Sequence, residues 1–84
     1  MIVNGYFVIK FNGDGVEILS AYINNVFERV MFIEKENASK FMKIYNKNND
    51  LCVYHVEAYA NNKILYEDNK DIINNISSEK LMIV

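Results

Sequence analysis

The chain opens with an alternation of side-chain types that limits the structures its first segment can form. One side of an extended chain over residues 2–11 carries Val3, Gly5, Phe7, Ile9 and Phe11. Because successive side chains of a strand point to opposite faces, this pattern predicts a half-buried β-strand. The run Asn12-Gly13-Asp14-Gly15 follows, and these residue types tolerate the positive φ angles of tight turns. The segment therefore predicts a strand that turns back on itself, rather than a phosphate-binding loop, because the Gly-Lys-Ser/Thr ending of such a loop is missing.

Residues 16–33 fit two patterns. As strands, they divide into residues 16–23 and 26–33 on either side of Asn24 and Asn25, and half of them are β-branched or aromatic. As a helix, they form an apolar stripe at i, i+3, i+4 and i+7, with Asp14 and Glu17 as a capping box. We favour the two strands, because a second hairpin completes an antiparallel meander.

A helix is predicted for residues 37–48. Asn37 is placed to cap it, and Lys40, Lys43 and Lys47 lie on its polar side. Its apolar stripe consists of Ala38, Phe41, Met42 and Tyr45, with Ile44 at the edge. These features are typical of a helix that packs one face on a sheet.

The second half of the chain alternates again. Residues 51–60 predict a strand, residues 64–66 its hairpin return, and residues 71–76 a short helix. The apolar run at residues 81–84 adds a strand or docks on a neighbour. We therefore expect one α+β domain over residues 1–84, with a small, flat antiparallel sheet of about four to five strands and the main helix packed on one face.

The residue types that bind metals or act as nucleophiles do not converge in this pattern. Cys52 and His55 are three apart on a strand, so they point to opposite faces. A calcium-loop spacing links Asn46, Asn48, Asp50 and Glu57. Leu51 stands where that loop needs glycine, so we interpret the match as accidental. We expect no metal, cofactor or catalytic residue.

One strand face combines a base, an acid and a hydroxyl. His55, Glu57 and Tyr59 alternate along the predicted strand, which places them on the same face. A flat sheet in so small a domain rarely encloses a substrate, so we interpret this face as a contact surface. Because tyrosine is favoured at protein interfaces, we predict that Tyr6, His55, Glu57 and Tyr59 bind a partner.

Composition excludes several classes of protein. A formal net charge of −2 with a single arginine argues against a nucleic-acid surface. No apolar run approaches the roughly 20 residues that span a bilayer, and the N-terminus lacks the pattern of a signal peptide. The lone cysteine fits a reducing compartment, so we expect a cytoplasmic protein without membrane contacts. The abundance of Asn, Ile, Lys and Tyr, whose codons are AT-rich, indicates a low-GC bacterium or one of its phages or mobile elements.

Two functions remain open. The first is a small non-enzymatic binding protein that engages a host protein or its own copies, with an inhibitor of a host defence enzyme or other host enzyme as one form. An apolar fraction of 51% in 84 residues leaves a surplus that a partner would cover, so we expect a homodimer or higher oligomer. The alternative is an oligomeric small-ligand or nucleotide-binding protein with its pocket between subunits. Size and composition are typical of accessory proteins of phages and mobile elements.

Overall fold

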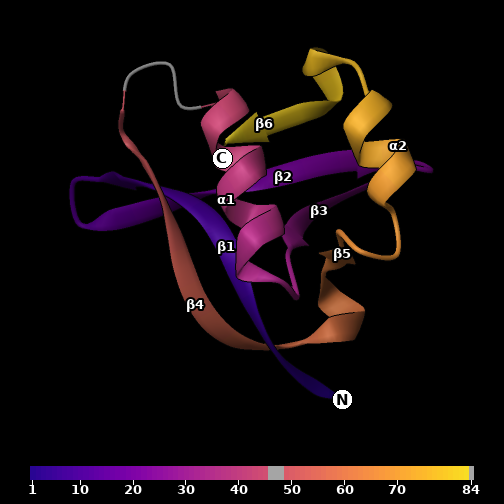
Figure 1. The fold of residues 1–84 in the computed structure, drawn as a ribbon, viewed down its shortest axis with the longest axis horizontal. Helices are drawn as coiled ribbons and strands as arrows, with labels where there is room; N and C mark the ends of the chain where they lie inside the picture. The colour runs from indigo at the N-terminus through magenta and orange to yellow at the C-terminus, as the bar shows by residue number, and fades with distance from the viewer. Residues whose placement is uncertain (46–48, 84) are drawn as a thin grey trace.

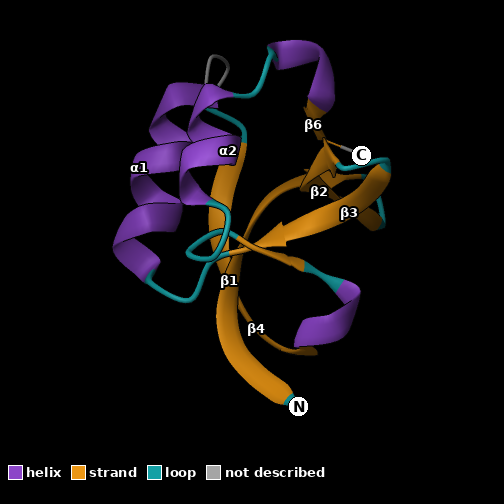
Figure 2. Cartoon of the chain, turned by 90° about the vertical axis from the view of Figure 1, so that its right-hand side faces the viewer, coloured by secondary structure: helices purple, strands orange, loops and turns teal. Residues whose placement is uncertain are grey.

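The computed structural model describes residues 1–45 and 49–83, and it shows a six-stranded mixed sheet with two α-helices on one side (Figures 1 and 2). The elements in chain order are β1 (Ile2–Asn12), β2 (Gly15–Ile23), β3 (Val26–Met31), α1 (Lys35–Tyr45), β4 (Leu51–Tyr59), η1 (Ala60–Asn62), β5 (Ile64–Leu65), α2 (Lys70–Asn75), η2 (Ser78–Lys80) and β6 (Leu81–Ile83). The α+β class and both predicted helices are confirmed. Residues 46–48 of the predicted main helix, and residue 84 of the last apolar run, lie outside the described residues.

Both predicted hairpins are present, so residues 16–33 form strands and not a helix. The β1–β2 turn has Gly13 at φ 61°, as the first central position of a type II′ turn requires. The β2–β3 turn has Asn24 and Asn25 at φ 52° and 64°, and two positive values are the mark of a type I′ turn. Glu17 caps no helix, and its carboxylate accepts a hydrogen bond from the Asn12 amide at 3.0 Å.

The prediction of a flat, purely antiparallel sheet is wrong. β5 pairs with β3 in parallel, whereas a hairpin return would have paired it with β4. β1 and β2 stay paired only as far as Ile9 and Ile18, and β6 then occupies the vacated edge of β2. The free half of β1 reaches the end of β3, where the Tyr6 and Phe32 N–H groups donate to each other's carbonyl oxygens at 2.7 and 2.8 Å. The sheet is therefore curled into a half-barrel.

Gly5 allows the close crossing of β1 and β3. A Cβ atom at this position would lie 2.8 Å from the Phe32 carbonyl oxygen and would overlap the terminal methyl group of Met31. Any side chain here would push the two strands apart, so the curl depends on a residue without a side chain.

The helices cover one face of the sheet through an aromatic cluster. Phe41 of α1 packs against Phe32 and Tyr66, with ring centroids 5.6 and 5.7 Å apart, and the Phe32 and Tyr66 rings lie 4.6 Å apart. All three are buried, and the Tyr66 hydroxyl donates to the Asn74 side-chain oxygen at 2.9 Å. α1 is thereby anchored to β3 and to the connection that leads into α2.

Glu67 holds the start of α1. The helix begins two residues before the predicted position, and Asn37 lies inside its first turn instead of capping it. The Glu67 carboxylate accepts hydrogen bonds from the Ile33 N–H at 2.9 Å, the Glu34 N–H at 3.1 Å and the Asn37 amide at 3.2 Å. Partial burial raises the pKa of Glu67, but these hydrogen bonds together outweigh burial and lower the pKa below its ordinary value of 4.5.

Candidate binding face

The four predicted contact residues lie together on the face that carries the helices. The register of β1 and β4 places Tyr6 opposite His55, and their rings meet edge to face at a centroid distance of 5.3 Å. Glu57 and Tyr59 follow toward the N-terminal end of β1, and both are exposed. The structure thus brings the set onto one surface beside α1. That this surface binds a partner stays a prediction.

Cys52 and His55 point to opposite faces, as their spacing predicts. Cys52 packs at the edge of the second apolar cluster and is half-buried, whereas His55 is exposed beside Tyr6. The calcium-like spacing includes Asn46 and Asn48, which lie outside the described residues. Asp50 forms an ion pair with Lys10 at 3.6 Å. Among residues 1–45 and 49–83, no three His, Cys, Asp or Glu side chains are grouped as a metal site would require.

The opposite face of the sheet bears neither α-helix, and we call it the open face (Figure 2). α1 packs with Val8 and Val53, so the neighbouring residues of β1 and β4 point to the open face. On β1, β2, β3 and β4, the open-face residues are Val3, Gly5, Phe7, Ile9, Phe11, Val16, Ile18, Ser20, Tyr22, Phe27, Arg29, Met31, Cys52, Tyr54, Val56 and Ala58. Only Arg29 among them is charged.

An apolar groove of about 240 Å³ runs along the open face across three strands. It is lined by Phe7, Ile9, Phe11, Val16, Ile18, Tyr54 and Val56. Phe7, Ile9 and Ile18 are buried and form its floor, whereas its walls are exposed: Phe11 by 62%, Tyr54 by 53% and Val16 by 49%. The groove therefore combines a buried floor with large apolar walls that water still reaches.

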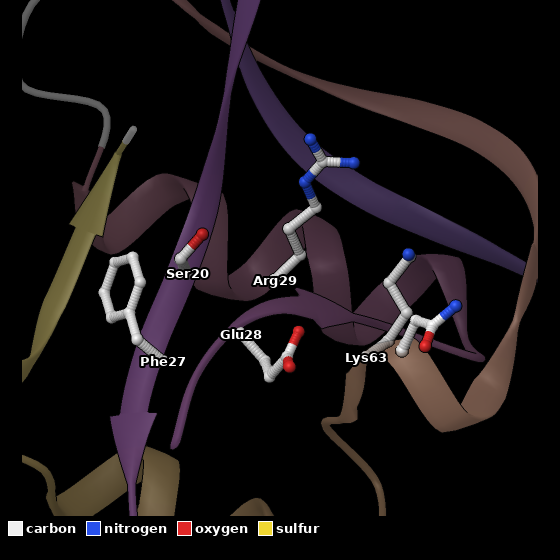
Figure 3. A pocket seen from close by; sticks show the side chains of 6 residues that line it. Ser20, Phe27, Glu28, Arg29 and Lys63 are labelled. Carbon is white, nitrogen blue, oxygen red and sulfur yellow. The ribbon is translucent and has the colours of Figure 1, made fainter. Parts of the chain in front are cut away.

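A second hollow, of about 470 Å³, is cationic (Figure 3). It is lined by Ser20, Phe27, Glu28, Arg29, Asn62 and Lys63. Figure 3 shows the Arg29 and Lys63 side chains extending to the same side, with the Glu28 carboxylate directed away from the guanidinium. Lys10–Asp50 is the one ion pair among the described residues, so neither cation here is ion-paired, and the two cations outnumber the Glu28 carboxylate in this hollow. The buried Ser20 hydroxyl donates to the Ile18 carbonyl oxygen at 3.1 Å.

A contact between Phe7 of the groove and Lys63 of the cationic hollow links the two. The Phe7 ring forms part of the groove floor, and the Lys63 ammonium lies 5.9 Å from the centroid of the same ring. That distance is within the range of a cation–π contact. The open face therefore presents apolar side chains at one end and two unpaired cations at the other, along one continuous surface.

Sequence reasoning missed this surface for an identifiable reason. Phe7, Val8 and Ile9 are all apolar, so β1 has two apolar faces, and the pattern does not say which one receives the helix. Arg29 and Lys63 are far apart in the chain, and the curl of the sheet brings them together. The uninterrupted apolar run in β1 is the one local signal that side chains on both faces of the strand are buried.

Comparison with other proteins identifies no relative. The chain matches no protein-family model, and neither the curated proteins nor the solved structures yield a similar chain. Among the described residues, no helix has the length and apolar character needed to cross a membrane. The function must therefore be argued from the open face itself.

Proposed function

We propose that this protein is a non-enzymatic binding protein that engages a partner protein through its open face. The observation that carries the proposal is the apolar groove, where Phe11, Val16 and Tyr54 remain exposed around a buried floor. Leaving large apolar side chains in water forgoes about 25 cal/mol per Å² of burial, and contiguous patches of this kind mark interaction surfaces. An aromatic wall such as Tyr54 supplies contact area at low entropic cost.

The charge of the open face indicates a second feature of the partner, an acidic group. The chain has a formal net charge of −2, yet no acidic residue is among the open-face strand residues. Arg29 and Lys63 line the cationic hollow together with a single carboxylate, that of Glu28, and neither cation forms an ion pair with a described residue. A matching segment therefore carries an apolar or aromatic side chain for the groove and an acidic group for the cationic hollow. Such complementarity contributes mainly to specificity and association rate.

The alternative function, a small-ligand protein, would use the cationic hollow alone. An anionic ligand would contact Arg29 and Lys63 there, but it would leave the walls of the groove exposed. The partner protein is the better proposal because a single contact covers both parts of the face.

The test compares open-face variants with matched variants on α1. We expect Phe11→Thr with Tyr54→Thr to abolish capture of the partner from a lysate of a low-GC bacterium. Ile44→Ala is the control, since Ile44 is 70% exposed on α1 and its truncation also removes exposed apolar surface. With the captured protein purified, Tyr54→Thr alone is expected to raise Kd about 10- to 100-fold.

A second pair of variants tests the charge. Reversal of Arg29 and Lys63 to glutamate is expected to weaken binding and remove its salt dependence, whereas the same reversal of Lys40 and Lys43 on α1 leaves binding intact. Capture that survives the open-face variants, or no capture by the wild-type chain, contradicts the proposal. Stabilisation by a nucleotide or phosphate without protein capture supports the alternative.

A further inference from the structure

β4 is an edge strand of the described sheet, because its only strand partner there is β1. It pairs with β1 in an unbroken register from Ile2 opposite Tyr59 to Lys10 opposite Leu51, and no described strand lies beyond it. Edge strands are usually protected from other chains by proline, lysine, a bulge or short length. β4 has nine residues, no proline, no lysine and no bulge. Along residues 53–59, its outer N–H and C=O groups are therefore available to another strand.

The sequence of β4 is complementary to itself in one antiparallel register. When two copies of a strand pair about a two-fold axis, one residue lies opposite its own copy. With Val56 at that position, His55 lies opposite Glu57 of the second copy, and the pair occurs twice by symmetry. The same register sets Val53 opposite Tyr59 of the second copy, a β-branched and aromatic combination that stabilises sheets.

Neighbouring registers lose this match. Pairing about His55 places the two imidazoles opposite each other and Val53 opposite Glu57. Pairing about Glu57 places two carboxylates opposite each other, and like charges at directly opposed positions are destabilising. Pairing about Tyr54 leaves Glu57 facing Leu51. Only the register about Val56 joins the acid with the base.

We propose that the protein is a homodimer in which the two β4 strands pair antiparallel about Val56, so that the two sheets become one. The predicted contact residues His55, Glu57 and Tyr59 then lie in the dimer interface. On the open face, Val56 meets its own copy and Tyr54 meets Ala58, which places the two apolar grooves side by side. The dimer does not rest on the binding function proposed above, although Tyr54 and Val56 belong to both surfaces, and Phe11 belongs to the groove alone.

Two measurements on the wild-type chain test the dimer without any substitution. Sedimentation equilibrium is expected to give twice the mass of one chain. Hydrogen exchange is expected to show concentration-dependent protection of the outward-facing amides of residues 53–59. A monomer at all concentrations, or a dimer without protection in β4, overturns the proposal.

Cysteine variants in a Cys52→Ala background test the register. Val56→Cys is expected to form a symmetric intermolecular disulfide under mild oxidation, because directly opposed Cα atoms lie about 4.5–5.5 Å apart. His55→Cys alone is the control, since its two copies would be more than about 7 Å apart. An equimolar mixture of His55→Cys and Glu57→Cys chains is expected to crosslink. Crosslinking of His55→Cys alone, or none at Val56→Cys, overturns this register.

Charge exchange tests the proposed pair. Glu57→Lys is expected to raise the dimer dissociation constant at least about tenfold, because it removes the partner of His55 and adds a lysine to the edge. Combining it with His55→Glu places opposite charges at the two positions and is expected to recover most of the loss. A double variant as weak as Glu57→Lys alone overturns the pairing of residues 55 and 57.

Discussion

Replacement of Glu67 by glutamine is expected to destabilise the protein by loosening the start of α1. One carboxylate oxygen accepts from the Glu34 N–H and the Asn37 amide, and the other accepts from the Ile33 N–H. The glutamine oxygen replaces the first of these acceptors, but its NH₂ group then faces the Ile33 N–H as a second donor. One charge-assisted hydrogen bond is lost and two become neutral.

The expected cost follows from those three contacts. A hydrogen bond to a charged group contributes about 1.5–3 kcal/mol when it is buried, and these contacts lie near solvent, which reduces the value. We expect Glu67→Gln to lower the free energy of unfolding by about 1–2 kcal/mol. For a domain of this size, each kcal/mol corresponds to a fall in Tm of about 4–8 °C.

The assay is urea unfolding followed by circular dichroism, with Asp68→Asn as the matched control. Asp68 is the next residue, is exposed, and its substitution changes the charge equally. Because the folded-state pKa of Glu67 lies below 4.5, its stabilisation is fully present above pH 4.5 and is lost as the pH falls through the folded pKa. The difference between wild type and Glu67→Gln should therefore shrink in acid. Equal stabilities at neutral pH, or a difference that persists in strong acid, would refute the reasoning.

Substitutions at two further positions, Gly5 and Asn25, test the backbone geometry and are measured by urea unfolding. Gly5→Ala is expected to lower the free energy of unfolding by about 1–3 kcal/mol, because the added methyl group clashes with Phe32. Gly15→Ala is the control and should be tolerated, since the nearest atom to its Cβ would be the Asn12 oxygen at 3.8 Å. Equal losses of stability in the two variants would contradict the close crossing of β1 and β3. Asn25→Gly is expected to raise stability by a few tenths of a kcal/mol, because glycine adopts φ 64° without strain, and Asn25→Val to lower it by about 1–2 kcal/mol. A stable valine variant would exclude the type I′ turn.

The parts of the fold that sequence predicts are those set by local rules. The turns at Gly13 and Asn24 follow from residues that adopt positive φ, and α1 follows from the spacing of Ala38 and Phe41. Each of these features depends on at most about a dozen consecutive residues, so a pattern in the chain reports it directly.

The parts that sequence does not predict depend on contacts between distant residues. The curl requires Gly5 to lie against Phe32, and a glycine inside a strand pattern signals a close approach without naming what approaches. The parallel pairing of β5 follows from the position of β3 after the curl. No local pattern marks Glu67, and its role at the start of α1 emerges only when residues 33 and 67 meet.

Partner binding at the open face and dimerisation through the edge of β4 both involve β4, but different substitutions test them. Tyr54 and Val56 point into the groove, whereas His55 and Glu57 point to the helix-bearing face. Because side chains of one strand alternate, a substitution at residue 57 changes the pairing of copies without entering the groove. A substitution of Phe11 changes the groove without touching β4's outer edge. If dimerisation sets the two grooves side by side, Glu57→Lys should lower the affinity for a partner that spans both copies. The affinity for a partner that fits a single groove should not change.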